Sequence, residues 1–405
     1  MNATADTSAL PAAREATLLR NPRAQPETRW PAPDPAVWTF HRRMPAYRET
    51  TLFDCPDLAQ RYGVKRVLVK AETQRLGLPS FKILGASWAS YRALCDHLGF
   101  DPEPWANIND LARRIAYLRP FSFAAATDGN HGRAVAFMAR LLGFGCHIFV
   151  PKGTVPARIH AIQNDGATVT VVDGDYDAAV ARSAQEASDK CLVISDTSWP
   201  GYDVTPRRVV EGYSTIFMEV EQALAAAGVG APDVVVVPVG VGAFMSSAVS
   251  YYRSRPWQGA LVGVEPADAN CVQASARARE MVAVPGPHRS IMVGLNCGLP
   301  SPVAWPRVSA GVEWFVSVGD DRARQGMKEL ADSGVVAGET GSAALGALAA
   351  LHGDASTAEF RESGLLGPEK TILVMVTEGA TDRGNYQAIV GKRPEEVGTI
   401  LTVSR

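Results

Sequence analysis

Short apolar runs alternate with longer helical patterns along the chain from about residue 64 onward. The runs are rich in Val, Ile and Phe and nearly continuous in apolar character, which is typical of strands buried on both faces of a parallel sheet. They predict strands at 66–70, 121–126, 147–151, 168–172, 192–195, 234–238, 261–265, 314–318 and 371–376. The segments between them predict helices at about 130–143, 155–164, 176–189, 207–227, 243–254, 321–333 and 341–352. This alternation predicts an α/β fold.

No Gly/Ser-rich or Pro-rich linker divides the chain cleanly, so two domains would have to be entwined. Three compact β-α units between about 120 and 200 predict a small sheet, and the remaining strands predict a larger one. We therefore place a small domain at 89–211 and a large domain at 36–88 and 212–405. Residues 1–35 are rich in Ala, Pro, Arg and Thr without apolar periodicity, which predicts a loosely ordered N-terminal arm.

Composition narrows the classes of function. With 46% hydrophobic residues the chain has ample material for a buried core. The 40 Lys+Arg against 42 Asp+Glu give a net charge of −2, which argues against nucleic acid or an acidic membrane surface as the main partner. The six cysteines and seven histidines form neither a C-x-x-C nor an H-E-x-x-H motif, so no metal site is expected. No run reaches 18 apolar residues and the N-terminus does not resemble a secretory signal, so we expect a cytoplasmic protein without disulfide staples.

Lys82 is a candidate for covalent chemistry. Ser80 is expected to cap a helix whose first turn holds Lys82, where the helix dipole disfavours a cation. A lysine is tolerable there when it is neutral or bonded as an imine. The alternative is an ordinary surface lysine at a helix start.

Two glycine-containing turns follow predicted strands. The turn at 127–133 holds Asn130 and His131 between two glycines, which suggests close approach of the backbone to a ligand, although an Asx turn would serve equally to reverse the chain. His131 taken alone is more typical of a structural histidine. The loop from Gly240 to Phe244 opens a helix whose free amides suit a phosphate. A dinucleotide site is the alternative there, with Glu265 as the ribose-binding acid, but Met245 replaces the third glycine of that motif.

Two further polar segments end predicted strands. Thr377–Asp382 follows the last strand and Asp196 follows the strand at 192–195. Carboxyl ends of strands in an open α/β sheet are where ligands bind. For Thr377–Asp382 the alternative is an ordinary exit of the chain from the sheet, and for Asp196 it is a helix cap.

These segments, in this order, resemble the fold-type II family of pyridoxal-phosphate enzymes, the group of tryptophan synthase β and threonine dehydratase. Within that family the resemblance is strongest to the diaminopropionate ammonia-lyases and runs from about residue 40 to 390. It is carried by "ATDGNHGR" at 126–133, "DTSWPGY" at 196–202, "VGVGAFM" at 239–245, "VGLNCGLPSP" at 293–302, "AGETGSAALG" at 337–346 and "TEGATD" at 377–382. The chain departs from the relatives' pattern at seven positions, several of which are expected to line the substrate pocket. These positions are Ser246, Ser247, Asn270, Gln273, Val293, Asn296 and Ala380.

The resemblance implies two entwined three-layer α/β domains with mainly parallel twisted sheets, the larger of which binds pyridoxal 5′-phosphate (PLP). It implies that Lys82 forms the imine and acts as a base, that Asn130 bonds the phenolic oxygen and that Thr377 bonds the ring nitrogen. It places the phosphate on Gly240, Val241, Gly242, Ala243 and Phe244. It also implies a homodimer and two neighbouring cysteines, Cys271 and Cys297.

The expected reaction is α,β-elimination of a small amino-acid substrate, D- or L-2,3-diaminopropionate, to pyruvate and ammonia. Asp196 and Asp128 are the candidates for the acid that the amine leaving group needs. Asp128 stands where generic dehydratases have a serine, and it is also the candidate for a second base, used for the D enantiomer. The alternatives are a serine/threonine-type dehydratase or another β-eliminating enzyme on this fold, a nicotinamide-dependent oxidoreductase, and a cofactor-binding protein without turnover.

Overall fold

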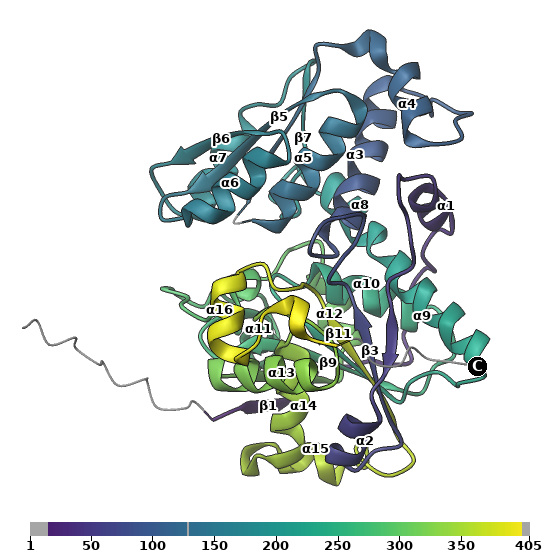
Figure 1. Cartoon of the computed structure of the whole chain (residues 1–405), viewed down its shortest axis with the longest axis vertical. Coiled ribbons are helices and arrows are strands. Elements are labelled where there is room, and N and C mark those ends of the chain that lie inside the picture. Colours follow the sequence, from purple (N-terminus) through teal and green to yellow (C-terminus); the bar gives the residue numbers. More distant parts are fainter. Residues whose placement is uncertain (1–14, 128, 399–405) are drawn as a thin grey trace, which may run out of the picture.

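The computed structural model describes residues 15–127 and 129–398 and contains two β-sheets (Figure 1). The larger sheet has seven strands in the order β1-β10-β9-β8-β11-β3-β2, and the smaller has four in the order β6-β5-β4-β7. The strands are β1 Thr17–Arg20, β2 Leu52–Asp54, β3 Arg66–Ala71, β4 Ser122–Ala126, β5 Gly145–Pro151, β6 Thr168–Val172, β7 Cys191–Val193, β8 Val234–Pro238, β9 Ala260–Pro266, β10 Trp314–Val318 and β11 Thr371–Val376.

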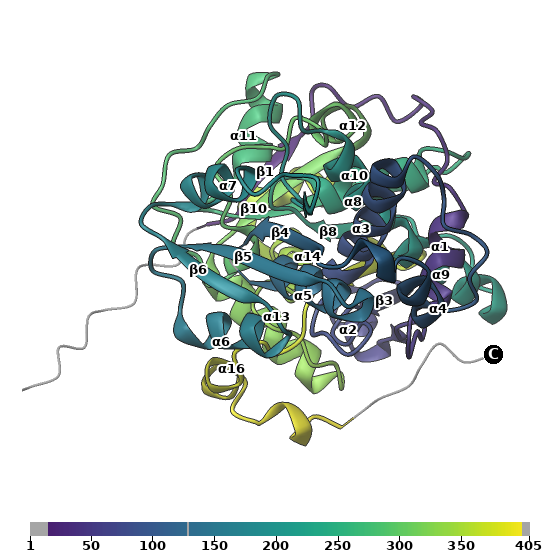
Figure 2. The same ribbon diagram turned by 90° about the horizontal axis from the view of Figure 1, so that it is seen from above.

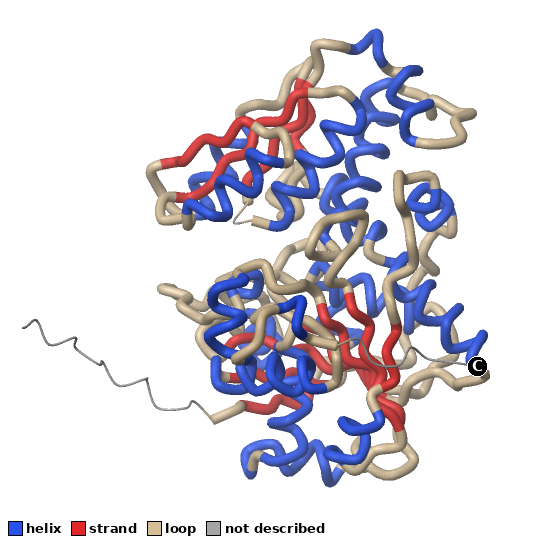
Figure 3. Tube along the Cα trace, viewed as in Figure 1, coloured by secondary structure: helices blue, strands red, loops and turns tan. Residues whose placement is uncertain are grey.

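Both sheets are mainly parallel and are covered by helices on their two faces (Figure 3). The helices are α1 Ala36–Arg42, α2 Pro56–Tyr62, α3 Lys82–Leu98, α4 Ile108–Arg114, α5 Asn130–Leu142, α6 Pro156–Asn164, α7 Tyr176–Ala184, α8 Val204–Gly212, α9 Ser214–Ala227, α10 Ala243–Tyr252, α11 Cys271–Ala278, α12 Trp305–Gly311, α13 Asp320–Asp332, α14 Ala343–Gly353, α15 Ala358–Glu362 and α16 Arg383–Val390. Every residue of β8, β9, β10 and β11 is buried, as expected for strands with helices on both faces. The fold class expected from the sequence is thereby confirmed.

The four-stranded sheet lies above the seven-stranded sheet, and α3 runs from the larger part into the smaller beside α8 (Figures 1 and 2). All strands of the small sheet fall between residues 122 and 193, inside the segment expected to form the small domain. The chain therefore leaves the large sheet after β3 and returns to it at β8. The domain boundaries themselves stay a prediction.

The nine strands predicted from apolar runs are all present, whereas the two edge strands β1 and β2 were not predicted. Both edge strands run antiparallel to their neighbours and have only four and three residues. A short strand with a single neighbour needs no continuous apolar run, which is why the pattern does not reveal it. The described residues contain no helix that is both long and apolar enough to cross a membrane.

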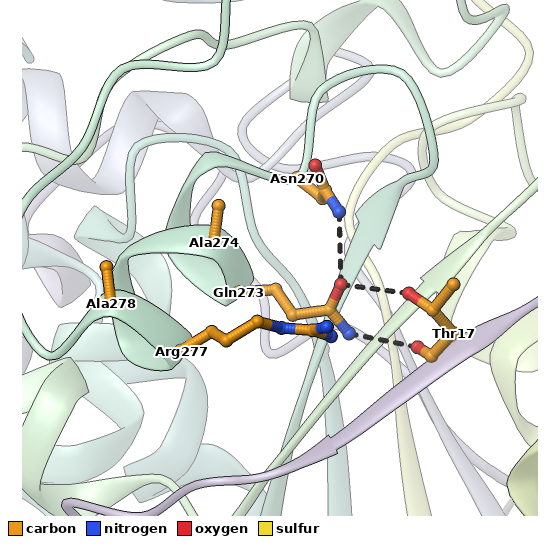
Figure 4. Close-up of a pocket in the computed structure, with 6 residues that line it drawn as sticks. All are labelled: Thr17, Asn270, Gln273, Ala274, Arg277 and Ala278. Atoms are coloured by element: carbon orange, nitrogen blue, oxygen red, sulfur yellow. Dashed lines mark hydrogen bonds between the residues drawn. The ribbon is translucent and has the colours of Figure 1, made fainter.

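Strand β1 corrects the expectation that residues 1–35 form a loosely ordered arm. Thr17 accepts a hydrogen bond from Gln273 Nε2 at its carbonyl (2.9 Å) and donates from Oγ1 to Gln273 Oε1 (3.0 Å), and Asn270 Nδ2 donates to the same oxygen (3.1 Å; Figure 4). Asn270 and Gln273 thus fasten β1 to the large sheet and line a small pocket there. They do not line the cavity at Lys82, which is a correction of their expected place in the substrate pocket.

The helix predicted at 207–227 is two helices, α8 and α9, that meet at Tyr213. At this break α8 packs closely against α3. A Cβ atom on Gly85 would lie 2.5 Å from the Tyr213 ring, and one on Gly212 would lie 2.4 Å from the Leu84 carbonyl oxygen. The two glycines therefore let α8 approach the helix that begins at Lys82, and the turn between α8 and α9 directs Tyr213 toward that lysine.

Candidate active site

A cavity with about 900 Å³ of free space, part of it open to solvent, lies at the carboxyl ends of strands from both sheets. Its walls include Lys82, Asn130, Asp196, the loop from Gly240 to Phe244, Thr377 and Glu378. The structure therefore gathers into one cavity the described residues that were expected to catalyse the reaction or to bind the cofactor. Of the departures expected in the substrate pocket, Asn296 lines this cavity, whereas Ser246, Ser247, Val293 and Ala380 do not. Asp128 lies outside the described residues, so its role stays a prediction.

Lys82 is the first residue of α3, as predicted, but Ser80 does not cap this helix. Phe81 occupies the N-cap position without a side-chain hydrogen bond, and Ser80 instead pairs through its backbone with Glu378 in an isolated antiparallel bridge. This correction has a physical reason. The segment before α3 is held against the end of β11, so its backbone is committed to that strand end.

The Lys82 ammonium forms an ion pair with Asp196, with 2.8 Å between Nζ and Oδ2. Burial alone would raise the pKa of Asp196, but neighbouring His131 and Lys82 outweigh it and lower that pKa to about 2. Asp196 is therefore a carboxylate held beside the lysine. It is not a helix cap, the role that an isolated aspartate at this place would most simply have.

The Gly240–Phe244 loop forms a cradle of backbone amides. Gly242 has φ +98°, a left-handed conformation that favours glycine, and the next residue begins α10. The first helical backbone bond runs from the Ser246 N–H to the Gly242 carbonyl (2.8 Å), so the amides before it are available to an anion. A Cβ on Gly240 would come within 3.1 Å of Cys297 Sγ, so the loop at Gly240 packs closely against Cys297.

Replacing Gly242 by Asp is expected to weaken cofactor binding because the new carboxylate would add a negative charge to the loop that is expected to hold the phosphate. Gly242→Asn is the matched control, since Asn has the same size and tolerates the same backbone conformation without the charge. We expect Gly242→Asp to raise the dissociation constant of PLP at least about tenfold above that of Gly242→Asn, or about 1.4 kcal/mol. Titration of the two apoenzymes with PLP measures this difference, and equal constants would contradict a phosphate at this loop.

Thr377 and Asn130 offer the polar groups that a pyridoxal ring requires. Thr377 Oγ1 is buried and has no hydrogen-bond partner among the residues described. Asn130 Nδ2 donates to Glu378 Oε2 (2.7 Å), which fixes the amide and leaves its second N–H available. Burial raises the pKa of Glu378 against the opposing effect of Thr340 and Asn130. A lysine, an amide cradle, an unpaired hydroxyl and a fixed amide together fit PLP.

Glu265 does not serve the role that a dinucleotide site would need. Its buried carboxylate accepts hydrogen bonds from the Val272 and Gln273 amides (2.8 and 2.7 Å) at the start of α11. Burial raises the pKa of Glu265 to about 8, although these amides lower it. The acid that a dinucleotide site would use to bind the ribose is therefore hydrogen-bonded to the start of α11 instead.

Cys271 and Cys297 lie on either side of Gly240. Cys271 Sγ lies 3.9 Å from the Gly240 carbonyl oxygen, and Cys297 Sγ faces the Cα of the same glycine. All six cysteines fall in the described part of the chain, and none of them forms a disulfide there. Pairing of these two under oxidising conditions stays a prediction.

Several residues of the cavity were not predicted from the sequence. Tyr213 lies at a helix junction inside a segment predicted as one helix, and Gly294–Cys297 lie in a loop without a strand before them. Thr340 reaches the cavity from the segment before α14. The exceptions are Asn296, which was expected to line the substrate pocket, and Cys297, which the resemblance had singled out. For the rest of this loop and for Thr340 the signal was their place in the motifs at 293–302 and 337–346. In the described ranges no group of three His, Cys, Asp or Glu could hold a metal ion.

The fold and the site define the class of protein, and comparison with known proteins agrees. A sequence model of the family described as pyridoxal-phosphate dependent enzyme matches residues 43–378, and the chain belongs to this family. It is similar to the diaminopropionate ammonia-lyase of Escherichia coli K12, with 36% identity over 359 residues that cover 87% of this chain and 89% of the relative.

Two solved structures of the E. coli diaminopropionate ammonia-lyase share the fold. The complex with D-serine has a TM-score of 0.85 and 33% identity and covers 93% of this chain and 97% of that chain. The complex with an aminoacrylate-PLP azomethine reaction intermediate has a TM-score of 0.83 and 32% identity, with the same coverage. The findings support a fold-type II carbon–nitrogen lyase that uses PLP for elimination, in preference to a nicotinamide-dependent oxidoreductase.

Proposed function

We propose that this enzyme eliminates the β-amino group of 2,3-diaminopropionate and that pyruvate and two molecules of ammonia result after hydrolysis. The observation that carries the proposal is Asp196, a carboxylate held 2.8 Å from the Lys82 amine inside the cavity. A substrate with a second amino group gives this carboxylate a partner. A hydroxyl leaving group carries no positive charge to pair with it.

The roles of the residues follow from their positions. Bound PLP supplies the electron withdrawal that makes the substrate Cα–H acidic. Lys82 removes that proton, and Asp196 binds the β-amine and assists its departure. The amides at Gly240–Phe244 hold the phosphate, and Asn130 and Thr377 fix the ring by its two polar edges. Because Thr377 is a neutral hydroxyl, it cannot hold a proton on the ring nitrogen as a carboxylate would, which favours elimination over transamination.

A panel of substrates tests the proposal. The purified enzyme, loaded with PLP, should release pyruvate from diaminopropionate with a kcat/KM at least about a hundredfold above that for serine or threonine, or about 2.7 kcal/mol in transition-state free energy. The D-serine complex of the E. coli relative makes D-serine the most informative competitor. A higher kcat/KM for serine or threonine would favour a dehydratase, and no pyruvate from any of them would contradict the proposal.

Asp128 is proposed to act as the base for the D enantiomer, on the strength of the resemblance alone. Lys82 approaches Cα from one face of the cofactor and can remove the proton of one enantiomer only. We expect Asp128→Asn to lower kcat/KM for D-diaminopropionate by two or more orders of magnitude, about 3 kcal/mol, while appreciable activity on the L enantiomer remains. Separate assays of the enantiomers check this, and equal losses for both would assign Asp128 another role.

We also propose that the enzyme works as a cytoplasmic homodimer. The resemblance to the family supports the dimer. The six cysteines form no C-x-x-C motif and no disulfide staple is expected, which supports a reducing compartment. Light scattering of the purified holoenzyme measures the mass directly: twice the 43.2 kDa of the chain supports the dimer, and any other mass contradicts it.

A further inference from the structure

His131 has one ring nitrogen with a partner and one without. The side chain is buried, and Nε2 lies 2.8 Å from the Ile194 carbonyl oxygen. A carbonyl oxygen only accepts hydrogen bonds, so Nε2 carries a hydrogen. Nδ1 is also buried but makes no hydrogen bond within the described structure. The charged group that it faces is Asp196, with Oδ2 at 3.7 Å.

The charge on this histidine is tied to that of Asp196. In the neutral ring with its hydrogen on Nε2, Nδ1 presents a lone pair toward a carboxylate, which leaves two acceptors facing each other in a buried place. A proton on Nδ1 turns this contact into an attraction between opposite charges. The geometry therefore favours a proton between Nδ1 and Oδ2 whenever Asp196 lacks another cation.

Lys82 is that other cation, and the catalytic cycle removes it. Its ammonium pairs with the same Oδ2 atom of Asp196. While Lys82 is covalently bonded to the cofactor it cannot present an ammonium to Asp196. His131 is then the group positioned to supply the compensating proton.

We infer that Lys82, Asp196 and His131 form a proton relay in which His131 stores the proton that the departing β-amine takes up. As the Cβ–N bond breaks, its electron pair stays on nitrogen, and one proton passes from His131 Nδ1 through Asp196 to that nitrogen, so that Asp196 is a carboxylate again. Ammonia leaves, and the ring is neutral with its hydrogen on Nε2. Lys82, which has taken the Cα proton, loses it to Asp196 before bonding the cofactor again, and Asp196 returns it to His131.

The relay needs no outside acid, because the Cα proton of one turnover replaces the proton spent on the amine. His131 acts through Asp196 and is therefore a positioning residue. The destination of the proton rests on the proposed function, whereas the sharing of a proton between His131 and Asp196 does not depend on the substrate.

Two variants of His131 separate proton storage from structural support. In His131→Gln, the new side-chain amide reaches the place of Nε2 and can still donate to Ile194, but nothing faces Asp196. In His131→Asn, the shorter amide reaches the place of Nδ1 and can donate a hydrogen bond to Asp196, but it has no proton to transfer. Both variants should therefore lose the relay.

The assay compares diaminopropionate with 3-chloroalanine, whose chloride leaves without a proton. We expect both variants to lower the ratio of kcat/KM for diaminopropionate to that for 3-chloroalanine about a hundredfold, the usual scale of general acid catalysis. An unchanged ratio would contradict the relay, as would recovery of the ratio in His131→Asn alone. If the wild-type enzyme eliminates chloride but releases no ammonia from diaminopropionate, the proposed function fails.

Nuclear magnetic resonance of the holoenzyme labelled with ¹⁵N-histidine tests the proton itself, even if the variants fold poorly. In the wild-type holoenzyme both ring nitrogens of His131 should bear hydrogen, and in Asp196→Asn the Nδ1 signal should move to that of an unprotonated nitrogen. An unprotonated Nδ1 in the wild-type holoenzyme would overturn the inference, whatever the substrate proves to be.

Discussion

Lys82→Ala is expected to abolish the covalent bond to PLP and to lower turnover at least about a thousandfold, or about 4 kcal/mol in activation free energy. Lys82 begins α3 and lines the cavity beside Asp196, and none of the other described residues that line this cavity is a lysine. Alanine removes both the amine that holds the cofactor and the base that takes the Cα proton. The loss should therefore exceed that of either function alone.

The visible absorption of the cofactor and its reduction by borohydride measure the covalent bond. In the wild-type enzyme, reduction should attach the cofactor to the peptide that contains Lys82, as mass spectrometry can show. Lys152→Ala is a matched control because Lys152 is exposed and pairs with Asp173 on the surface. It should keep both the absorption band and the turnover. A reducible imine that persists in Lys82→Ala would assign the cofactor lysine elsewhere.

The fold was largely predictable because its central strands are buried on both faces. Strands such as Val234–Pro238 and Thr371–Val376 are buried along their whole length, so their residues are mainly apolar and the sequence pattern predicts them. Strand β1 escaped prediction because it is held by the side chains of Gln273 and Asn270, more than 250 residues away. The close approach of Tyr213, at the junction of α8 and α9, likewise depends on Gly85, a residue of another helix.

The site was predictable where it lies at the ends of strands and turns. Asp196, Asn130, the Gly240 loop and Thr377 each follow a strand, and parallel strands bring such ends together. The pairing of Lys82 with Asp196 could not be read from the residues, because the two belong to segments 114 positions apart. His131 was expected to be a structural histidine. Nε2 fits that expectation because it donates a hydrogen bond to the Ile194 carbonyl oxygen. The sequence could not show that Nδ1 is buried without a hydrogen bond among the described residues, because this depends on how the chain packs.

Asp196→Asn is expected to have the second largest effect, a fall in kcat/KM for diaminopropionate of at least about a thousandfold, or about 4 kcal/mol. Asparagine keeps the size of the side chain but removes its charge, so it can neither hold the Lys82 ammonium nor pass a proton. It also leaves a partly buried lysine without its carboxylate partner, and removing one partner of such an ion pair is destabilising.

The expected consequence in the absence of PLP follows from the direction of the pKa shift of Asp196. Because its pKa is lowered to about 2 in the folded chain from 3.8, the carboxylate stabilises the fold above about pH 4, and this contribution is lost as the pH falls toward 2. The apoenzyme of Asp196→Asn should therefore unfold at a lower temperature than the wild type at neutral pH, and this difference should disappear in acid.

Asp203→Asn is the matched control for Asp196→Asn. Asp203 is a half-exposed aspartate seven positions further along the chain, and it pairs with Arg207 on the surface. Its replacement should leave kcat/KM unchanged and should have a smaller effect on the pH dependence of unfolding than Asp196→Asn has.

The comparison with 3-chloroalanine separates the two roles of Asp196. If Asp196 only orients Lys82, Asp196→Asn should slow both substrates equally, because both need the Cα proton removed. If Asp196 also delivers the proton to the amine, diaminopropionate should lose more by at least about tenfold. An Asp196→Asn enzyme that retains wild-type turnover of diaminopropionate would contradict both roles.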